Sequence, residues 1–465
     1  MKSAFTVSAI QSGAGKTTVS LALMASLKRL GFDVQPFKAG PDFIDPGLHR
    51  AITGKTSWNL DRWMCSDDYV RQTFITHASA SDVAVVEGVM GLFDGGETST
   101  AALAKLVGLP IVLVLDVRGM AESAAAVVAG ILSMDNGLTL AGVILNRVGS
   151  PKHLQRVRAA IDLYTGVEVI GAIPTEAKIH VQERHLGLFT AEDGPVNEEF
   201  TGSAATLARE NINLHRLLSL TTVPSDSVYR KDDSPYLLNR YCHISGVSRG
   251  VSHTGGTLAV ARDKAFCFYY EDNFELLVHY GVKIVFFSPL DDEALPGGID
   301  GLYLGGGYPE LYAVRLSGNI SMRESIRRFV SSGRVVYAEC GGFMYLTNGI
   351  NDFDGHYYPM VGTFPVSATM KRGRVHLGYR EVTLAQDTII GKKGDRLRGH
   401  EFHYSVIDEM PSVVKRVYTP EENAGGYQLG NCLASYVHLH FAGGSGTAAV
   451  ALANSLAGSA VNFTG

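Results

Sequence analysis

Two segments of the chain carry residues whose types and spacing could do chemistry. Residues 12–18 read Ser-Gly-Ala-Gly-Lys-Thr-Thr and follow an apolar run at 5–10. Residues 338–342 read Ala-Glu-Cys-Gly-Gly and follow a second apolar run, with His438 further along the chain. A glycine-rich loop can hold the phosphates of a nucleotide, and a cysteine with a histidine base can release ammonia from an amide such as glutamine. Together they predict that a triphosphate activates a carboxylate, which the released ammonia converts into a carboxamide.

The first segment has the order of a phosphate-binding loop: a strand, a glycine-rich turn, and Lys-Thr-Thr opening a helix. We expect Lys16 to reach the β- and γ-phosphates of ATP, and the Thr17 hydroxyl to bind Mg²⁺. Ile10 stands where the usual pattern begins with glycine, and Gln11 where partitioning ATPases place a second lysine. A glycine turn that merely starts a helix is the alternative, but the strand-to-helix junction favours the phosphate site. The predicted nucleotide-binding residues are Ser12, Gly13, Ala14, Gly15, Lys16, Thr17, Thr18, Lys38 and Asp45.

Carboxylates that could support the Mg²⁺ follow other predicted strands, where the ligand crevice of a parallel sheet lies. Asp42 and Asp45 belong to the loop after residue 38, and Glu87 follows the apolar run 83–86. We predict Thr17, Glu87 and Asp45 as the metal-binding residues. The alternatives are a solvated loop acid for Glu87 and ordinary turn formation for the aspartates, including Asp94.

The second segment has the features of a cysteine nucleophile. Two glycines after Cys340 suit a tight turn that exposes the thiol and leaves N–H groups free to hold an oxyanion. The glycine run 305–307 supplies a second such turn, and His438 would be the base. A lone cysteine is more often a small buried apolar residue, but the order of strand, elbow, glycine turn and histidine favours catalysis.

Two further histidine pairs leave alternatives open. His438 and His440 would face the same side of a strand, and we favour His440 as the residue that orients His438 over the reverse assignment. His400 and His403 could line a pocket or be structural. The predicted catalytic residues are Cys340, His438, His440 and Lys16.

Composition limits the class of protein. The 465 residues suit two domains, and a net charge of -5 without blocks of Lys or Arg excludes the usual footprint for nucleic acid or anionic lipid. The five cysteines lack metal-ligand spacing, which indicates reduced thiols. No targeting or membrane segment is visible, so we expect a cytoplasmic enzyme of small molecules. A homodimer is compatible with these features, and the oligomeric state is left open.

Apolar strands alternate with helical patterns in both halves of the chain, which predicts an α/β protein with two open α/β domains. Strands are expected at 5–10, 83–86, 110–115 and 141–145, and again at 258–261, 283–287, 301–304 and 335–338. The predicted boundaries are a P-loop domain at 1–195, a partly helical linker at 196–255, and an amidotransferase domain at 256–465. The stretch 220–255 has weak patterning, and its role is left open.

Specific blocks across nearly the whole length resemble the cobyrinic acid a,c-diamide synthase family. The matching blocks are residues 12–18, 38–46, 59–64, 87–95, 146–150, 184–188, 261–266, 305–310, 338–342 and 438–441. The resemblance implies a dethiobiotin-synthetase-like ATPase domain joined to a class I glutamine amidotransferase domain. Other class I enzymes place a Glu two residues after the catalytic histidine, and His440 occupies that position here.

The resemblance also implies the reaction: ATP- and Mg²⁺-dependent amidation of the a and c acetate groups of a tetrapyrrole polycarboxylate, with glutamine as nitrogen donor. It assigns Thr17 and Glu87 to the metal, Cys340 to the nucleophile and His438 to the activating base. Members act on cobyrinate, hydrogenobyrinate, nickel-sirohydrochlorin or sirohaem, so the macrocycle, its metal and the order of amidation are left open. The rival interpretations are a P-loop switch ATPase and a tetrapyrrole-binding chaperone with an inactive glutaminase domain.

Overall fold

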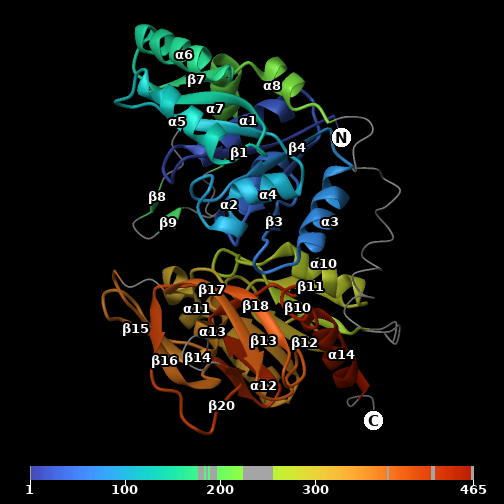
Figure 1. Cartoon of the computed structure of the whole chain (residues 1–465). Coiled ribbons are helices and arrows are strands. Elements are labelled where there is room, and N and C mark those ends of the chain that lie inside the picture. Colours follow the sequence, from blue (N-terminus) through green and yellow to red (C-terminus); the bar gives the residue numbers. More distant parts are fainter. Residues whose placement is uncertain are drawn as a thin grey trace. The chain divides into compact units, whose positions relative to one another are not determined.

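The computed structural model describes residues 2–175, 183–184, 187–188, 196–223, 255–373, 376–419 and 425–461. The chain forms two compact units, divided near residue 240 (Figure 1). Each unit contains a seven-stranded sheet covered by helices, which confirms the predicted pair of α/β domains. Among the described helices, none is long and apolar enough to span a membrane.

The first domain is a fully parallel sheet in the order β3-β2-β4-β1-β5-β6-β7. Its strands are β1 (Ser3–Ala9), β2 (Val34–Ala39), β3 (Trp58–Leu60), β4 (Val83–Glu87), β5 (Ile111–Asp116), β6 (Leu140–Val148) and β7 (Val169–Pro174). Its helices are α1 (Lys16–Arg29), α2 (Ile44–Thr53), α3 (Asp67–Ala78), α4 (Thr100–Leu106), α5 (Ser123–Met134), α6 (Pro151–Thr165), α7 (Glu198–Asn211) and α8 (Leu214–Leu220). A short pair, β8 (Glu183–Arg184) and β9 (Gly187–Leu188), is antiparallel, and the family block at 184–188 otherwise lies outside the described residues.

Helices cover both faces of this sheet, because successive strand residues point to opposite sides. On β5, Val112 and Val114 pack with α1, α2, α7 and α8, whereas Leu113 and Leu115 pack with α4, α5 and α6. Both faces are therefore apolar, and polar chemistry is confined to the ends of the strands.

Residues 196–223 pack against the first sheet. Ala204 and Ala208 of α7 belong to the same buried cluster as α1, and the Ser3 and Thr221 hydroxyls hydrogen bond at 2.6 Å. The sequence placed this segment in the linker, but its apolar face completes one side of the first domain. Residues 224–254, the rest of the predicted linker, lie outside the described residues.

The second domain combines one mixed sheet with two smaller sheets. The large sheet has the order β11-β10-β12-β13-β23-β22-β20, parallel from β11 to β23 and antiparallel beyond it. Its strands are β10 (Thr257–Ala261), β11 (Lys283–Phe287), β12 (Gly301–Leu304), β13 (Val335–Glu339), β20 (Lys415–Arg416), β22 (Gly426–Leu429) and β23 (Cys432–Ser435). The helices are α10 (Glu271–His279), α11 (Ala313–Gly318), α12 (Ile320–Ser331), α13 (Gly341–Leu346) and α14 (Ala448–Val461).

The two smaller sheets have the orders β15-β14-β16-β19 and β21-β17-β18-β24. Their strands are β14 (Thr347–Asn351), β15 (Tyr357–Pro359), β16 (Phe364–Met370), β17 (His376–Leu384), β18 (Arg396–His403), β19 (Ser405–Ile407), β21 (Tyr418–Thr419) and β24 (Val437–Leu439). Strand β18 pairs with β24 and sets His400 opposite His438. Neither small sheet was predicted from the sequence, yet the second, in which the neighbouring strands pair antiparallel, carries the predicted base.

Helix α1 offers a direct test of the packing, because Leu23 is completely buried whereas Leu30 at its end is 53% exposed. Leu23→Ala should lower the free energy of unfolding of this domain by about 3 kcal/mol, whereas Leu30→Ala should change it by less than about 1 kcal/mol. Both tryptophans, Trp58 and Trp63, lie in this domain, so tryptophan fluorescence in a urea titration reports its unfolding. Equal effects of the two variants would contradict the described burial.

Candidate active sites

The phosphate loop has the backbone of an anion site. Gly13 and Gly15 have φ angles of 75° and 97°, which favour glycine. A Cβ on Gly15 would lie 2.3 Å from Nδ2 of Asn146, so this glycine is also required for space. Gly15 caps α1 without a side-chain hydrogen bond. The first N–H groups of α1 are therefore available to phosphate oxygens.

Residues near the carboxyl ends of β5 and β6 support the same loop. Asn146 donates from Nδ2 to the carbonyl of Ala14 at 2.8 Å. Arg147, whose φ is 60°, donates from Nη1 to the carbonyl of Gly13 at 2.9 Å and to Asp116 at 2.5 Å. The sequence had not predicted these contacts, since a polar residue after a strand gives no sign of which loop it reaches.

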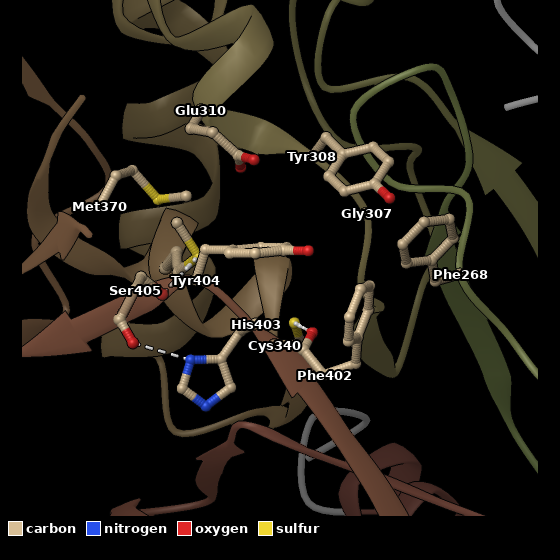
Figure 2. Close-up of a pocket in the computed structure, with 11 residues that line it drawn as sticks. Phe268, Gly307, Tyr308, Glu310, Cys340, Met370, Phe402, His403, Tyr404 and Ser405 are labelled. Carbon is tan, nitrogen blue, oxygen red and sulfur yellow. Dashed lines mark hydrogen bonds between the residues drawn. The ribbon is translucent and has the colours of Figure 1, made fainter. Parts of the chain in front are cut away.

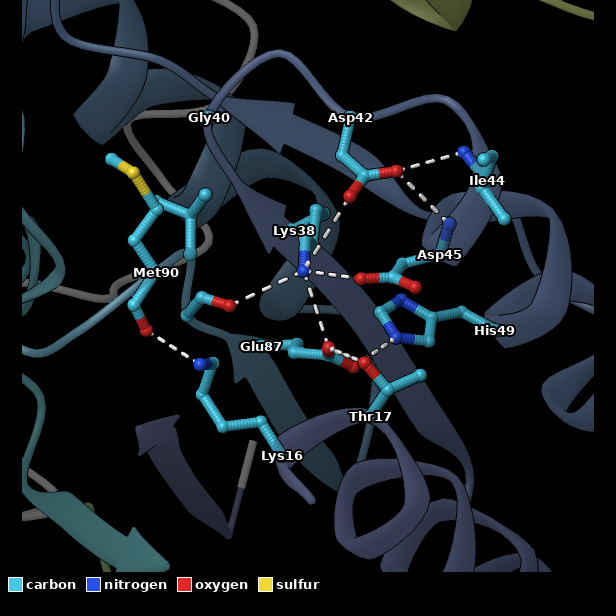
Figure 3. A network of polar contacts seen from close by, with 12 residues as sticks. Lys16, Thr17, Lys38, Gly40, Asp42, Ile44, Asp45, His49, Glu87 and Met90 are labelled. Atoms are coloured by element: carbon cyan, nitrogen blue, oxygen red, sulfur yellow. Dashed lines mark hydrogen bonds and ion pairs between the residues drawn. The ribbon is translucent and has the colours of Figure 1, made fainter. Parts of the chain in front are cut away.

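The Lys16 ammonium is held by backbone carbonyls beside the phosphate loop. Its Nζ donates to the carbonyl of Met90 at 2.5 Å (Figure 3) and to that of Gln11 at 3.2 Å. Burial and the neighbouring Lys38 lower the pKa of its ammonium. A phosphate would supply the negative charge that these carbonyls lack, so the side chain is suited to a triphosphate.

Lys38 lies at the centre of a buried group of carboxylates (Figure 3). The register of β2 and β4 sets Lys38 beside Glu87. Its Nζ donates to Asp45, and lies 3.2 Å from Oε1 of Glu87 and 3.8 Å from Oδ2 of Asp42. Although burial would lower the pKa of Lys38, Asp45 and Glu87 raise it well above its usual value. The ammonium is therefore charged and holds the carboxylates together.

Glu87 is fully buried, so it is not a solvated loop acid. Its Oε1 accepts the Thr17 hydroxyl at 2.7 Å, and its Oε2 lies 2.8 Å from Nε2 of His49, whose Nδ1 lies 2.9 Å from the Ser57 hydroxyl. Burial opposes ionisation of Glu87, but Lys38 and the hydrogen bond from His49 lower its pKa below the usual range. His49 was missed in the sequence because it lies in α2, apart from any motif.

The donor set fits a Mg²⁺ ion that also binds phosphate. Thr17 and Glu87 are in contact, and Oδ1 of Asp45 is buried without a hydrogen-bond partner. Among the described residues, no group of three His, Cys, Asp or Glu side chains is arranged to hold a metal by itself. This agrees with the usual preference of Mg²⁺ for one or two carboxylates together with substrate phosphates.

The other two predicted aspartates have turn contacts. Oδ1 of Asp42 accepts the N–H groups of Ile44 and Asp45 at the start of α2, at 2.8 and 3.1 Å. Oδ2 of Asp94 accepts the N–H of Gly91 at 2.8 Å. These contacts match the turn-forming alternative for both residues.

Cys340 occupies a sharp turn between β13 and α13. Its φ of 47° and ψ of -105° form an uncommon conformation for a residue with a side chain, at a cost of about 1–3 kcal/mol. The N–H of Cys340 donates to Ser435 at 2.7 Å, and that of Gly342 to Gly305 at 2.8 Å. A Cβ on Gly342 would lie 2.1 Å from the carbonyl oxygen of Leu304, so only glycine allows α13 to start here.

The glycine turn after β12 lies beside both Cys340 and His438. A Cβ on Gly306 would lie 2.2 Å from Cε1 of His438, and a Cβ on Gly341 would lie 3.1 Å from the nitrogen of Gly307. The N–H of Gly306 donates to Phe268 at 3.3 Å, so the N–H groups of Gly307 and Gly341 are better placed to hold an oxyanion.

The surroundings of the cysteine keep it neutral when no substrate is bound. Its thiol donates to the carbonyl of Phe402 at 3.7 Å. Burial and the nearby Glu310 raise the pKa of Cys340, while burial together with His400 and His403 lowers that of His438 to about 3. A neutral thiol and a neutral imidazole can exchange a proton when the nucleophile attacks.

Glu339 lies next to the predicted base. Its Oε2 is 4.0 Å from Nδ1 of His438, and its carboxylate accepts the hydroxyls of Tyr303 and Tyr337, both at 2.7 Å. Burial raises the pKa of Glu339 to about 7. The residue was overlooked in the sequence, although an acid at the end of an apolar strand, directly before the nucleophile, is a readable signal.

His440 has different neighbours. Its Nε2 lies 3.9 Å from Oδ2 of Asp272, its Nδ1 accepts the N–H of Ala442 at 3.3 Å, and its ring centroid lies 5.1 Å from that of Tyr270. Burial lowers the pKa of His440 to about 3. These contacts fix the turn after β24, and the role of His440 in orienting His438 stays a prediction.

His400 and His403, the other histidine pair, have different surroundings. His403 lines a small pocket beside Cys340 (Figure 2). Its Nε2 lies 2.8 Å from Glu401, and its ring stacks on Tyr436 with centroids 3.7 Å apart. His400 lies on β18 opposite His438, edge-on to Tyr379. Both are thus close to the site.

Comparison with known proteins gives the same division of the chain. Residues 5–188 match the model of the CobQ/CobB/MinD/ParA nucleotide binding domain, and residues 257–446 that of the CobB/CobQ-like glutamine amidotransferase domain. Cobyrinate a,c-diamide synthases are similar over 94% of this chain. The protein of Caldanaerobacter subterraneus is 39% identical, with 94% of its own length covered. Those of Picrophilus torridus and Salmonella typhimurium are each 40% identical, with 94% and 95% covered. The chain therefore belongs to the cobyrinate a,c-diamide synthase family.

Proposed function

We propose that the chain uses ATP and glutamine to convert the a and c carboxylates of cobyrinate into carboxamides. The observation that carries this proposal is that one chain holds both a phosphate loop and a strained cysteine elbow, in a sequence similar over 94% of its length to cobyrinate a,c-diamide synthases. A switch ATPase would not need the cysteine turn at Cys340, and a chaperone would need neither glutamine hydrolysis nor carboxylate activation.

Ammonia release falls to the second domain. The sulfur of Cys340 attacks the carboxamide carbon of glutamine while His438 takes the thiol proton. The N–H groups of Gly307 and Gly341 hold the oxyanion that forms. His438 then gives its proton to the departing nitrogen, and water hydrolyses the glutamyl thioester to glutamate and free thiol.

Carboxylate activation falls to the first domain. A carboxylate oxygen of cobyrinate attacks the γ-phosphorus of ATP, and ADP leaves. Lys16 and the N–H groups at residues 13–18 hold the phosphates, and Thr17, Glu87 and Asp45 would hold Mg²⁺, which neutralises charge on the phosphate oxygens. Ammonia attacks the acyl phosphate carbon, and phosphate leaves. Ser12 and Thr18 complete the loop, and Lys38 keeps Glu87 and Asp45 in place.

Cys340→Ser should abolish amidation with glutamine and leave amidation with high concentrations of ammonium close to the wild-type rate. The nucleophile serves only nitrogen release, and the phosphate site is in the other domain. Product formation is measured with each nitrogen source. Loss of both activities in a folded variant would contradict the division between two sites.

Lys16→Ala should reduce synthesis by about 10²-fold or more with either nitrogen source, because neutralisation of the γ-phosphate is common to both. Glutamine hydrolysis by Cys340 should persist, which serves as the folding control. Unchanged product yield would rule out phosphoryl activation through this lysine.

The base and its orienting partner can be separated by three variants. His438→Ala should reduce glutaminase activity by about 10²–10⁴-fold. Glu339→Gln should cost more activity than His440→Ala, because Glu339 lies beside Nδ1 of His438. A larger loss in His440→Ala would instead support the assignment made from the sequence.

The pH profile distinguishes positioning from mere structural support. Since the pKa of Glu339 is about 7, its stabilising charge is present above that pH and is lost as the pH falls through it. At saturating glutamine, kcat of the wild type should therefore decrease on the acid side of neutrality. Glu339→Gln should remove that decrease, and an unaltered profile would refute the orienting role of Glu339.

A further inference from the structure

The pocket beside Cys340 contains one carboxylate that the mechanism above does not use. The described lining residues are mainly apolar or aromatic, and Glu310 is the one acid among them. Figure 2 shows the Glu310 carboxylate and the Cys340 thiol directed into this pocket from different sides.

Glu310 has no cation to balance it. Within the described part of the chain, no Lys, Arg or His forms an ion pair with this carboxylate, and burial raises the pKa of Glu310 to about 7. Glu401 provides the contrast, since Arg380 and His403 pair with its two oxygens, at 2.6 and 2.8 Å. An acid in an apolar pocket without a partner is costly unless a ligand supplies the opposite charge.

The position of Glu310 follows from the glycine turn. It lies in the short 3-10 helix Pro309–Tyr312, directly after the glycines at 305–307. Pro309 packs close to Gly341, where an added Cβ would lie 2.9 Å from its Cδ. One loop therefore presents both the Gly307 N–H, toward the reacting carboxamide, and a carboxylate further into the pocket.

We propose that Glu310 binds the α-ammonium group of glutamine and thereby selects this amide over others. This inference rests on the proposed glutaminase function. Glutamine carries its carboxamide and its ammonium at opposite ends of a short chain, which matches a pocket with a thiol and a carboxylate. The charge-assisted hydrogen bond would hold the carboxamide carbon against Cys340.

The same contact explains how substrate could prepare the nucleophile. Burial and the charge of Glu310 both raise the pKa of Cys340 and so disfavour its thiolate. An ammonium bound to Glu310 offsets that charge, so the thiolate forms more readily in the complex with glutamine than in the free enzyme.

The test compares glutamine with 4-carbamoylbutanoate, which lacks only the α-amino group. Ammonia release by the wild type should favour glutamine in kcat/KM by about 10- to 100-fold, the range for a hydrogen bond to a charged group. Glu310→Gln should remove most of this preference by raising KM for glutamine, and it should not lower hydrolysis of the analogue. Glu324→Gln, which alters an exposed acid on α12 of the same domain, is the matched control and should keep the preference.

Amidation with ammonium should stay at the wild-type level in Glu310→Gln. Should that variant fail to fold, Glu310→Asp replaces it, since a shorter carboxylate should keep part of the preference and lose the rest. A wild-type preference retained in the variant, or equal losses on both amides, would overturn the inference. Absence of glutamine hydrolysis in the wild type would instead refute the proposed function, and this inference with it.

Discussion

Buried charge is the constraint on which both active sites depend. In the first domain the Lys38 ammonium is surrounded by Asp42, Asp45 and Glu87, and Lys38 and Glu87 keep each other charged inside the protein. In the second domain burial holds both Cys340 and His438 neutral. The first arrangement is suited to the charges of ATP, whereas in the second we propose that bound glutamine changes the surroundings of the thiol.

The strained parts of the backbone coincide with these sites. Among the described residues, the non-glycine residues with positive φ are Met90, Arg147 and Cys340. Met90 presents its carbonyl to Lys16, Arg147 reaches the carbonyl of Gly13, and Cys340 is the predicted nucleophile. Met90 and Cys340 follow buried parallel strands and Arg147 lies near the end of one, so the packing of the sheets balances the local cost of these conformations.

The strands predicted correctly are those whose residue types and apolar pattern both indicate a buried strand. Apolar, β-branched strands such as β5 were found close to their true bounds. Strand β2 was missed because Pro36 and the functional Lys38 interrupt its apolar pattern, although both are buried in the sheet. The antiparallel strands β17 and β18 contain many polar and charged residues, and the pairing of β18 with β24 depends on contacts distant in sequence.

Site residues that belong to a sequence motif were predicted, whereas those brought to the site only by tertiary packing were not. Residues 12–18 and Cys340 follow strands in a recognisable order. His49 and Glu310 acquire their surroundings only in the fold, from Glu87 in one domain and from the pocket beside Cys340 in the other. The orienting partner of His438 was sought two residues further along the strand, whereas the nearest acid comes from the end of β13. Spacing along one strand could not reveal a neighbour from another.

The central claim is that one chain couples ammonia release at Cys340 to carboxylate activation at Lys16. The most direct measurement supplies cobyrinate, ATP, Mg²⁺ and glutamine labelled with ¹⁵N in its amide, and follows the product by mass spectrometry and NMR. The account predicts a diamide with the label in the a and c carboxamides, and one ADP formed for each amide. Amides at the propionate groups, or labelled product formed without ADP, would contradict it.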